Sequence, residues 1–474
     1  MALEEYYTQI FIKQLGMEPT DGQRELFEKL GKFLVLPPDE FPLLVVRGYA
    51  GTGKTTAIST FIRVLKEFKK KCVLLAPTGR AAKVLSNYSG VQAKTIHKQI
   101  YRQKSLSDKE AKFRLDFNKS KDTVYIVDEA SLITIGTGME STIFGSGDLL
   151  DDLISYIRQN SGNKLILMGD SAQLPPIGLE ESPALDFDYV SQYSHVSDMV
   201  TLTDVVRQAG ESGILYNATL LRKEIEEGEL DAPRFRCKGF DDFKRISGGE
   251  LIEELDGAIS KYGLDEVVVL CRSNMRANRY NMGIRQTVLF MEEQLTRGDK
   301  LMIVKNCYQF LEDVKGMDYI ANGDIAKLQK ISRFEERYGL HFAEARISFP
   351  DYDDQEIVAK VILDTLESES ASLTYEQSNM LYQGVNEDYS HITTKKKRYE
   401  AIREDKYYNA LQLKYANAIT CHKSQGGQWK CVFIDNPFWQ EELTLDDLKW
   451  LYTAMTRATE KVYLVNFKDE VFAE

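Results

Sequence analysis

The residues best suited to chemistry stand in a glycine-rich stretch, GYAGTGKT at residues 48–55. Its glycines allow successive backbone N–H groups to point inward around phosphate oxygens, and the start of a following helix adds a partial positive charge. Lys54 can reach the outer phosphates, and the Thr55 hydroxyl can bind Mg²⁺. The pattern predicts a nucleoside triphosphate site held by Gly48, Ala50, Gly51, Thr52, Gly53, Lys54, Thr55 and Thr56.

Two adjacent acids are suited to complete that site. The apolar run at 123–127 has the length of a buried strand and ends at Asp128 and Glu129. Asp128 would hold Mg²⁺, commonly through water, and Glu129 would orient and deprotonate the attacking water. Gln173 follows a third apolar run at 163–170, at the edge where open α/β sheets bind ligands, and would contact the γ-phosphate. The alternative for Gln173 is a solvated side chain in a proline-terminated loop.

These groups need a sheet that brings strand ends together. Apolar runs at 43–47 and 71–76 also have strand length. The helix expected after the glycine loop carries apolar residues at helical spacing: Ile58, Phe61, Ile62 and Leu65. Strands and helices alternate along the chain, which predicts a doubly wound, mostly parallel α/β sheet.

Composition indicates a globular protein of 474 residues, 43% hydrophobic and 28% charged, with material for two or three cores. No apolar run reaches the roughly 18–20 residues that span a bilayer, and the N-terminal stretch MALEEYYTQIF is acidic. The six cysteines contain no C-x-x-C pair, which argues against a zinc ribbon or an iron–sulfur cluster. We therefore expect a cytoplasmic protein with no membrane partner.

The charge is uneven along the chain. Lys and Arg number 60 against 72 acids, a net charge of −12 that disfavours a passive nucleic-acid coat protein. From Arg63 to Lys104, however, eleven Lys or Arg stand beside one acid, Glu67. On charge alone this stretch is either a solvated helix face or part of a phosphate-binding channel.

The ordered set of motifs resembles superfamily 1 helicases of the 5′→3′ group, the RecD/Dda-like branch. The motifs span residues 20–466, nearly the whole chain. They are PTDGQREL (19–26), GYAGTGKT (48–55), APTGRAAK (76–83), TIH (95–97), DEAS (128–131), GDSAQLPP (169–176), VVRQ (205–208), GDKLMIVKN (298–306), NGDIAKL (322–328), TCHKSQGGQW (420–429) and YTAMTRA (452–458).

The resemblance implies two RecA-like domains that clamp ATP and Mg²⁺ between them. Arg207 and Arg457 would be arginine fingers; without the resemblance either would more often be a structural surface residue. Gln23 would read adenine, and Gly427 would approach the nucleotide. The catalytic set would be Lys54, Glu129, Gln173, Arg207 and Arg457, with Thr55 and Asp128 holding the metal.

The resemblance also implies a DNA track across both domains. Its candidate contacts are Thr78, Lys83 and His97 in the first domain and Thr420, His422 and Lys423 in the second. Cys421 and His422 are not expected to form a catalytic dyad, because neighbouring side chains on a strand point to opposite faces. Gln428 stands where RecD-type relatives often have an acid, which leaves a ribose contact there unassigned.

Two insertions should interrupt the motor domains. A small lobe is expected to carry a strand-separating pin, and a larger insertion should hold an SH3-like β barrel followed by a charged helical part containing KKKR at 395–398. KKKR is either a DNA contact or a solvated helix face. The predicted boundaries are 1–97 and 123–206 for the first motor domain, 98–122 for the lobe, 207–325 and 414–474 for the second motor domain, and 326–413 for the larger insertion.

The function expected from these features is an ATP-dependent DNA helicase that moves 5′→3′ along single-stranded DNA and unwinds tailed duplex. We expect a monomeric motor with replication, recombination or repair partners. One alternative is the motor subunit of a recombination or nuclease complex. Another is a P-loop kinase or an NTP-gated switch, although such proteins do not need the second motor half.

Overall fold

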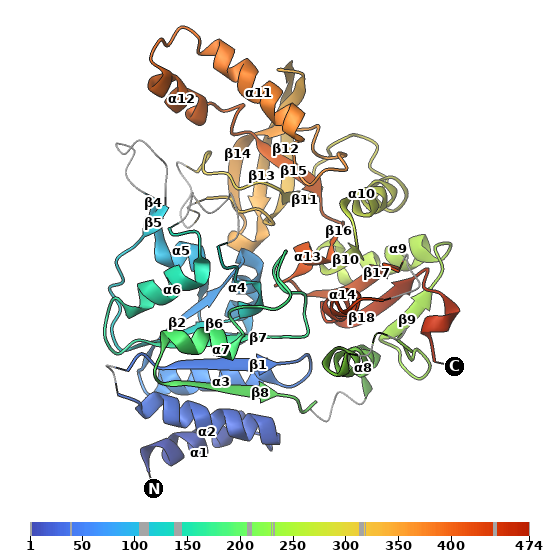
Figure 1. Ribbon diagram of the computed structural model, residues 1–474. Coiled ribbons are helices and arrows are strands. Elements are labelled where there is room, and N and C mark those ends of the chain that lie inside the picture. The colour runs from blue at the N-terminus through green and yellow to red at the C-terminus, as the bar shows by residue number, and fades with distance from the viewer. Residues whose placement is uncertain are drawn as a thin grey trace.

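The computed structural model has two α/β bodies side by side and a barrel beyond them that carries two further helices (Figure 1). The chain begins in the first body and ends in the second. The residues described are 2–37, 40–103, 113–136, 145–205, 211–228, 230, 233–311, 317, 319–438 and 443–473.

The first body is built on a six-stranded parallel sheet with the order β3-β2-β6-β7-β1-β8. Its strands are β1 (Leu43–Gly48), β2 (Lys71–Ala76), β3 (Ala93–Thr95), β6 (Thr123–Val127), β7 (Lys164–Gly169) and β8 (Ser197–Leu202). Its helices are α1 (Leu3–Leu15), α2 (Asp21–Val35), α3 (Lys54–Glu67), α4 (Gly79–Ser89), α5 (Ile96–Ile100), α6 (Leu149–Arg158) and α7 (Phe187–Val190).

Both faces of this sheet are covered. Alternate residues of a strand point to opposite faces, so Leu44 and Val46 pack in the core formed with α1, α2 and α3, whereas Leu43 and Val45 pack in the core formed with α6. This two-sided burial explains why the strands are continuous apolar runs in the sequence.

The second body has a five-stranded parallel sheet with the order β16-β10-β17-β18-β9. Helices α8 and α14 pack on one face, and α9 and α10 pack on the other. The strands are β9 (Phe243–Ile246), β10 (Val267–Cys271), β16 (Ala418–Thr420), β17 (Trp429–Asp435) and β18 (Ala458–Val465). The helices are α8 (Gly213–Glu227), α9 (Leu251–Tyr262), α10 (Asn274–Gly283), α13 (Cys421–Ser424) and α14 (Leu445–Met455). The predicted pair of RecA-like domains is confirmed.

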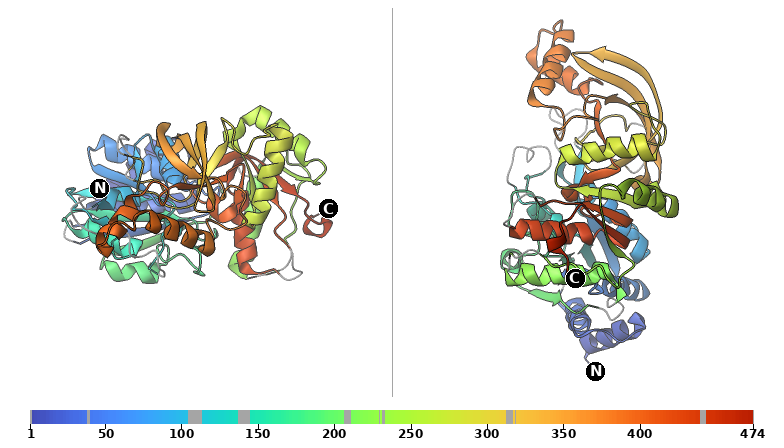
Figure 2. Two further views of the ribbon diagram at one scale, coloured as in Figure 1. Left: turned by 90° about the horizontal axis from the view of Figure 1, so that it is seen from above. Right: turned by 90° about the vertical axis from the view of Figure 1, so that its right-hand side faces the viewer.

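The larger insertion is a closed five-stranded barrel with two helices at its far end, as predicted for its class (Figures 1 and 2). Its elements are β11 (Lys300–Ile303), β12 (Ile325–Arg337), β13 (Leu340–Phe349), β14 (Gln355–Ile362), β15 (Leu411–Tyr415), α11 (Tyr375–Asp388) and α12 (Lys395–Glu404). The barrel extends beyond the boundaries predicted at 326–413, because all of β11 and the last two residues of β15 lie in segments assigned to the second motor domain. Short apolar runs such as KLMI suit either sheet, so the sequence alone did not separate them.

The small lobe contains an antiparallel pair, β4 (Tyr101–Gln103) and β5 (Phe113–Leu115). The residues between them, where a pin tip would lie, are outside the described part of the chain. Short helical turns lie at Ala130–Leu132, Ser191–Tyr193, Leu264–Glu266, Ile284–Val288, Pro350–Tyr352 and Asp469–Val471. Within the described residues, the helices lack the combined length and apolar character needed to cross a membrane.

Candidate active site at the cleft between the two sheets

A cavity of about 1550 Å³ lies between the two α/β bodies and is lined by both. Gly48, Thr52 and Gly427, which were predicted to contact the nucleotide, are not among its lining residues. The predicted nucleotide, metal and catalytic residues that do line it are Gln23, Ala50, Gly51, Gly53, Lys54, Thr55, Thr56, Asp128, Glu129, Gln173 and Arg457. Lys83, predicted as a DNA contact, lines it as well. The cleft therefore gathers most of the predicted nucleotide site.

The glycine loop joins the end of β1 to the start of α3. Gly51 and Gly53 have φ angles of 76° and 75°, in the left-handed region that favours glycine, and Gly53 is the N-cap of α3. The Thr52 hydroxyl donates to the Tyr49 carbonyl at 2.8 Å and is buried, so Thr52 braces the loop from within. Lys54 Nζ donates to the Gly48 carbonyl at 3.2 Å and so lies over the loop.

The two acids follow β6 as predicted. Asp128 Oδ1 accepts the Glu129 N–H at 2.8 Å, and Oδ2 accepts the Tyr88 hydroxyl at 2.5 Å. Burial and the neighbouring Glu129 charge raise the pKa of Asp128, and the Lys54 charge opposes that shift. Tyr88 comes from the end of α4, and no local pattern in the sequence marks it as a neighbour of the acid.

Arg457 crosses the cleft from the second body. It is 3% exposed, and its Nη1 lies 3.9 Å from Glu129 Oε1. Its guanidinium also donates to the carbonyls of Gly427 at 3.3 Å and Thr453 at 3.1 Å, which fix its position. Arg207, the second predicted finger, lies outside the described residues.

The loop after β7, which carries Gln173, is held by the second body. The Leu174 N–H donates to the Thr453 hydroxyl at 2.8 Å, and Gln425 Nε2 donates to the Leu174 carbonyl at 2.7 Å. Tyr452 forms a third bond to this loop by donating to Asp170 Oδ2 at 2.7 Å. The γ-phosphate sensor predicted at Gln173 is thus fixed from across the cleft.

Two buried oxygens in the cavity have no hydrogen-bond partner among the described residues. They are Glu129 Oε2 and Gln173 Oε1. Buried polar atoms are nearly always paired, so these two are suited to a polar ligand in the cleft. Asp128 and Thr55 offer oxygen ligands, the type that Mg²⁺ prefers. Within the described residues there is no cluster of three His, Cys, Asp or Glu side chains arranged to bind a metal.

Gln23 is engaged within its own helix cap. Its Oε1 accepts the Thr20 N–H at 3.1 Å, its Nε2 donates to the Gly53 carbonyl at 3.4 Å, and the residue is 2% exposed. The adenine contact stays a prediction: Gln23 lines the cavity, and the two bonds leave its amide one further N–H and one further lone pair.

Arg80 and Trp429 form a contact across the cleft that the sequence did not reveal. The guanidinium lies 4.0 Å from the ring centroid and donates to the Gln428 carbonyl at 3.0 Å. A Cβ on Gly427 would lie 2.7 Å from the Trp429 ring, so glycine is required for this approach. In this structure Gly427 packs against the Arg80–Trp429 pair, and its predicted nucleotide contact stays a prediction.

The predicted DNA contacts meet at one edge of the two sheets, beneath the barrel. Lys83 donates to the Pro350 carbonyl and lies 3.9 Å from Asp351 Oδ1, both in the loop after β13. Lys423 donates to Asn322 Oδ1 at 2.6 Å, in the loop before β12. The barrel loops therefore contact both cations of the predicted track, although Lys83 and Lys423 stay exposed.

The remaining track candidates are less exposed than expected. His97 packs against the rings of Tyr101 and Tyr319 at centroid distances of 5.6 and 6.3 Å, and burial lowers its pKa to about 4. Burial also lowers the pKa of His422. Both imidazoles are therefore neutral at pH 7 and would meet DNA as hydrogen-bonding groups rather than cations.

Thr78 and Thr420 are the N-cap residues of α4 and α13. The Thr78 hydroxyl accepts the Ala81 N–H at 3.2 Å. Cys421 is buried, and burial raises the pKa of its thiol to about 12. A thiolate is excluded there at neutral pH, in agreement with the prediction that the Cys–His pair is not a dyad.

Two family models match this chain. The one described as an AAA domain covers residues 22–234, and the one described as a UvrD-like helicase C-terminal domain covers residues 415–465. The first range holds the glycine loop and both acids, and the second holds Arg457.

Three curated relatives illustrate the range of similarity. An uncharacterized protein of Methanocaldococcus jannaschii is 24% identical over 458 residues, 89% of this chain and 36% of the relative. An uncharacterized protein of Acanthamoeba polyphaga mimivirus is 23% identical over 491 residues, 88% of this chain and 93% of the relative. An ATP-dependent RecD2 DNA helicase of Deinococcus radiodurans is 29% identical over 185 residues, 37% of this chain and 21% of the relative. The chain thus spans about a third of the archaeal relative and a fifth of the bacterial one.

Solved structures of Pif1 helicases are similar over most of the chain. A structure of two Pif1 helicases coordinating DNA unwinding at forked duplex has a TM-score of 0.46 at 17% identity, covering 97% of this chain and 94% of that one. A Bacteroides Pif1 helicase with ADP-AlF3 and single-stranded DNA has a TM-score of 0.42 at 16% identity, covering 97% and 95%. The fold assignment itself follows from the strand order of the two parallel sheets.

Proposed function

We propose that this chain is a superfamily 1 helicase of the RecD type, an ATP-dependent DNA helicase that moves 5′→3′ along single-stranded DNA. Both matched family models and the bacterial DNA helicase relative support this function. The polarity rests on the resemblance to the 5′→3′ group.

One observation carries the proposal: Arg457 of the second body is buried 3.9 Å from Glu129 of the first. Such a site is complete only when the two bodies are close, so catalysis and their relative movement are linked. An arginine finger contributes about 10³–10⁵ in rate by stabilising transition-state charge. A simple kinase or switch does not require this second half.

Each cleft residue has a defined task in the proposed hydrolysis. The backbone N–H groups from Gly51 to Thr55 cradle the phosphates, and Lys54 neutralises their charge. Glu129 orients and deprotonates the attacking water. Asp128 and Thr55 would hold Mg²⁺, which neutralises phosphate charge when bound. Gln173 would report the γ-phosphate to the second body through the bonds to Leu174.

We place the DNA strand at the edge where Thr78, Lys83 and Lys423 meet the barrel loops. A strand there would replace the contacts from Lys83 to Pro350 and from Lys423 to Asn322 with contacts to phosphates. One chain supplies both walls of the nucleotide cleft, which supports a monomeric motor.

The test is unwinding of matched duplexes that carry either a 5′ or a 3′ single-stranded tail, with Lys54→Ala as the blank. The proposal expects unwinding of the 5′-tailed duplex alone and ATP hydrolysis that rises with single-stranded DNA. Equal hydrolysis with and without DNA would overturn the motor function, and unwinding from 3′ tails alone would overturn the polarity.

The second candidate is a motor subunit of a larger recombination or nuclease complex. Two relatives at 26% identity over 268 residues are each a RecBCD enzyme subunit RecD of Mycobacterium tuberculosis, and this chain covers 42% of each. A subunit of this kind would show DNA-stimulated hydrolysis but weak unwinding until its partners are added. Full unwinding by the chain alone would exclude that dependence.

A further inference from the structure

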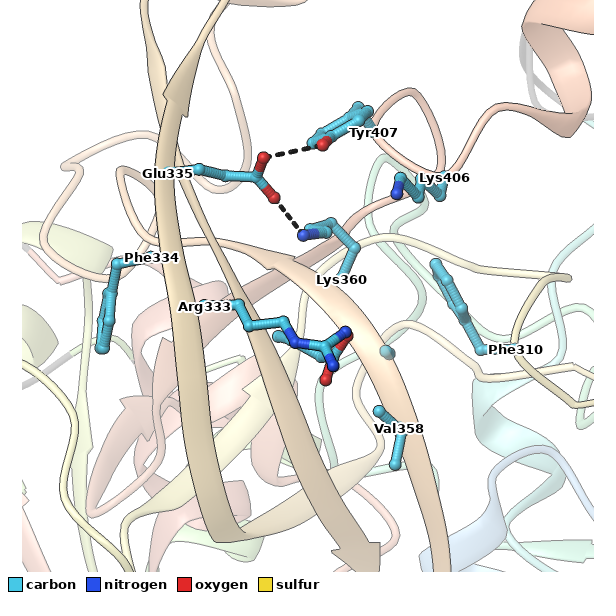
Figure 3. Close-up of a pocket in the computed structure, with 10 residues that line it drawn as sticks. Phe310, Arg333, Phe334, Glu335, Val358, Lys360, Lys406 and Tyr407 are labelled. Carbon is cyan, nitrogen blue, oxygen red and sulfur yellow. Dashed lines mark hydrogen bonds and ion pairs between the residues drawn. The ribbon is translucent and has the colours of Figure 1, made fainter.

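A second cavity lies on the outer flank of the barrel, away from the nucleotide cleft. It has a volume of about 340 Å³ and is formed by β12, β13, β14, the loop after β11 and the turn after α12. Figure 3 shows Phe310 and Lys406 across the hollow from Arg333 and Glu335. This volume is within the range of about 300–1,000 Å³ typical of ligand sites.

The walls combine aromatic rings with cations. Glu335 accepts bonds from Lys360 and from the Tyr407 hydroxyl, and Arg333 pairs with Glu344 at 2.9 Å. Lys406 is exposed, lies 5.2 Å from the Tyr407 ring centroid and makes no ion pair with another described residue. The bonds from Lys360 and Tyr407, together with the Lys406 charge, lower the pKa of the nearby Glu335 carboxyl. Aromatic faces beside cations are the combination that binds single-stranded nucleic acid.

The backbone holds two of these side chains in a costly conformation. Phe310 and Arg333 have φ angles of 68° and 56°, in the left-handed region. Bulky residues rarely adopt it, and such strain clusters at binding sites. Arg333 lies in the irregular part of the β12–β13 pairing between Ser332 and Glu335, where a bulge redirects the side chain toward the cavity.

The positive charge continues from the cavity along α12. Six Lys or Arg and three acids lie between Lys395 and Lys406, in a protein whose net charge is −12. Lys395 and Lys397 are exposed in the first turn of α12, where cations oppose the helix dipole. These charges reduce rather than increase helix stability, which favours a role in binding an anion such as the DNA backbone.

One loop connects the cavity to the base of the predicted pin. Tyr308 packs on Phe113 of β5 with ring centroids 5.2 Å apart, and Gln309 donates to the Arg403 carbonyl of α12 at 3.4 Å. Phe310 is the next residue and lines the cavity. Three consecutive residues, Tyr308, Gln309 and Phe310, therefore link the base of the predicted pin to α12 and to the cavity.

We propose that this barrel flank, formed by Phe310, Arg333, Lys406 and the first turn of α12, binds the strand displaced from the duplex. Bases stack on Phe310, and Lys406 and α12 contact the phosphates. Because this proposal rests on the helicase function above, it predicts a preference for forks that carry both tails over duplexes that carry the 5′ tail alone.

The test compares dissociation constants for a fork with both tails and for the same duplex with only a 5′ tail. The variants are Phe310→Ala and Lys406→Glu; Lys406 is exposed, and its ammonium lies over the Tyr407 ring. The matched control combines Phe290→Ala, a residue 81% exposed, with Lys468→Glu on the second motor domain. We expect the wild type and the control to bind the fork more tightly than the duplex with only a 5′ tail. Phe310→Ala should lose about five- to tenfold of fork affinity, as removal of one base stack does, and Lys406→Glu should lose fork affinity and the part of its salt dependence that comes from this phosphate contact.

A 2-aminopurine base in the 3′ tail provides a second readout, because stacking on Phe310 quenches its emission. Quenching that is lost in Phe310→Ala supports the proposal. A wild type with no fork preference but normal DNA-stimulated ATPase overturns it and leaves the helicase function standing. The proposal is also overturned if the affinity depends on the length of the duplex and not on the presence of the 3′ tail, because the flank would then contact the duplex. Absence of any DNA-stimulated ATPase would overturn the helicase function itself.

Discussion

The Tyr452 hydroxyl donates a 2.7 Å hydrogen bond to the Asp170 carboxylate, although the two residues belong to different motor domains. The same oxygen accepts the Ala50 N–H of the glycine loop at 2.9 Å. Tyr452 is 1% exposed, so no water competes for these bonds. One buried side chain on α14 therefore joins the glycine loop to the residue that follows β7.

Tyr452→Phe should remove the two hydrogen bonds that join the glycine loop and Asp170 to α14, while the packing of the ring is kept. Asp170 would lose its donor in a site where burial already raises its pKa, and a buried group left unpaired costs about 1–3 kcal/mol. We expect kcat for DNA-stimulated hydrolysis to fall about tenfold, with KM for ATP little changed, in steady-state assays. Tyr216→Phe, at an exposed tyrosine, is the control. Unchanged kcat would show that the bond is not used.

Lys54→Ala should abolish hydrolysis and leave DNA binding measurable. Its ammonium contacts the glycine loop at the Gly48 carbonyl, whereas Lys83 of the predicted track contacts the barrel loop at the Pro350 carbonyl. ATPase assays and fluorescence anisotropy with a labelled oligonucleotide check both parts. Loss of DNA binding together with hydrolysis would indicate a folding defect, which circular dichroism would reveal.

Arg457→Ala should retain ATP affinity and lose turnover by about 10³ or more, as removal of an arginine finger does. Arg457→Lys should not rescue it, because one ammonium cannot replace the separate bonds to Gly427 and Thr453 while facing Glu129. Nucleotide binding and single-turnover hydrolysis separate the two effects. Arg245→Ala, at an exposed arginine, serves as the control. Normal turnover in Arg457→Ala would remove the residue from the finger role.

Asp324 should make the barrel less stable as the pH rises. Burial raises the pKa of Asp324 to about 7, against hydrogen bonds from the Ala321 N–H and the Tyr352 hydroxyl. Between about pH 4 and 7 the unfolded carboxyl releases its proton while the folded one retains it, so unfolding becomes easier as pH increases.

Asp324→Asn removes this titration and keeps an acceptor oxygen. Thermal unfolding should show a gain over the wild type that is larger at pH 8 than at pH 5. The exposed Asp353→Asn is the matched control and should show no such trend. A gain that is equal at both pH values would contradict the assignment.

The sequence was most informative where geometry is local. The glycine loop and the Asp128–Glu129 pair were predicted because a strand, a turn and a helix N-terminus define them within a few residues. Tyr88 and Tyr452 were not, because each reaches its partner from an element distant in the chain. Their positions follow from the tertiary packing of α4 and α14, which carries no spacing signal.

The track residues show the same limit. Thr78, Lys83 and Lys423 were expected at one edge, and the structure brings them there. Lys83 contacts Pro350, and His97 packs against Tyr319. Both contacts depend on how the barrel docks on the first motor domain, which the sequence does not show. The barrel's own extent was misjudged for a related reason, since β11 and β15 could pair in either sheet until the fold selected their neighbours.

The barrel enters and leaves the second motor domain through the adjacent strands β11 and β15. Only Ala416 and Asn417 separate the end of β15 from β16, which leads directly to Thr420 and Lys423. A connection of two residues has too little slack to absorb a rotation, so the barrel acts as a lever on the segment at the motor edge. Mechanical load applied to the barrel flank in an optical trap should therefore change the stepping speed, because the short connection transmits the force to the motor edge.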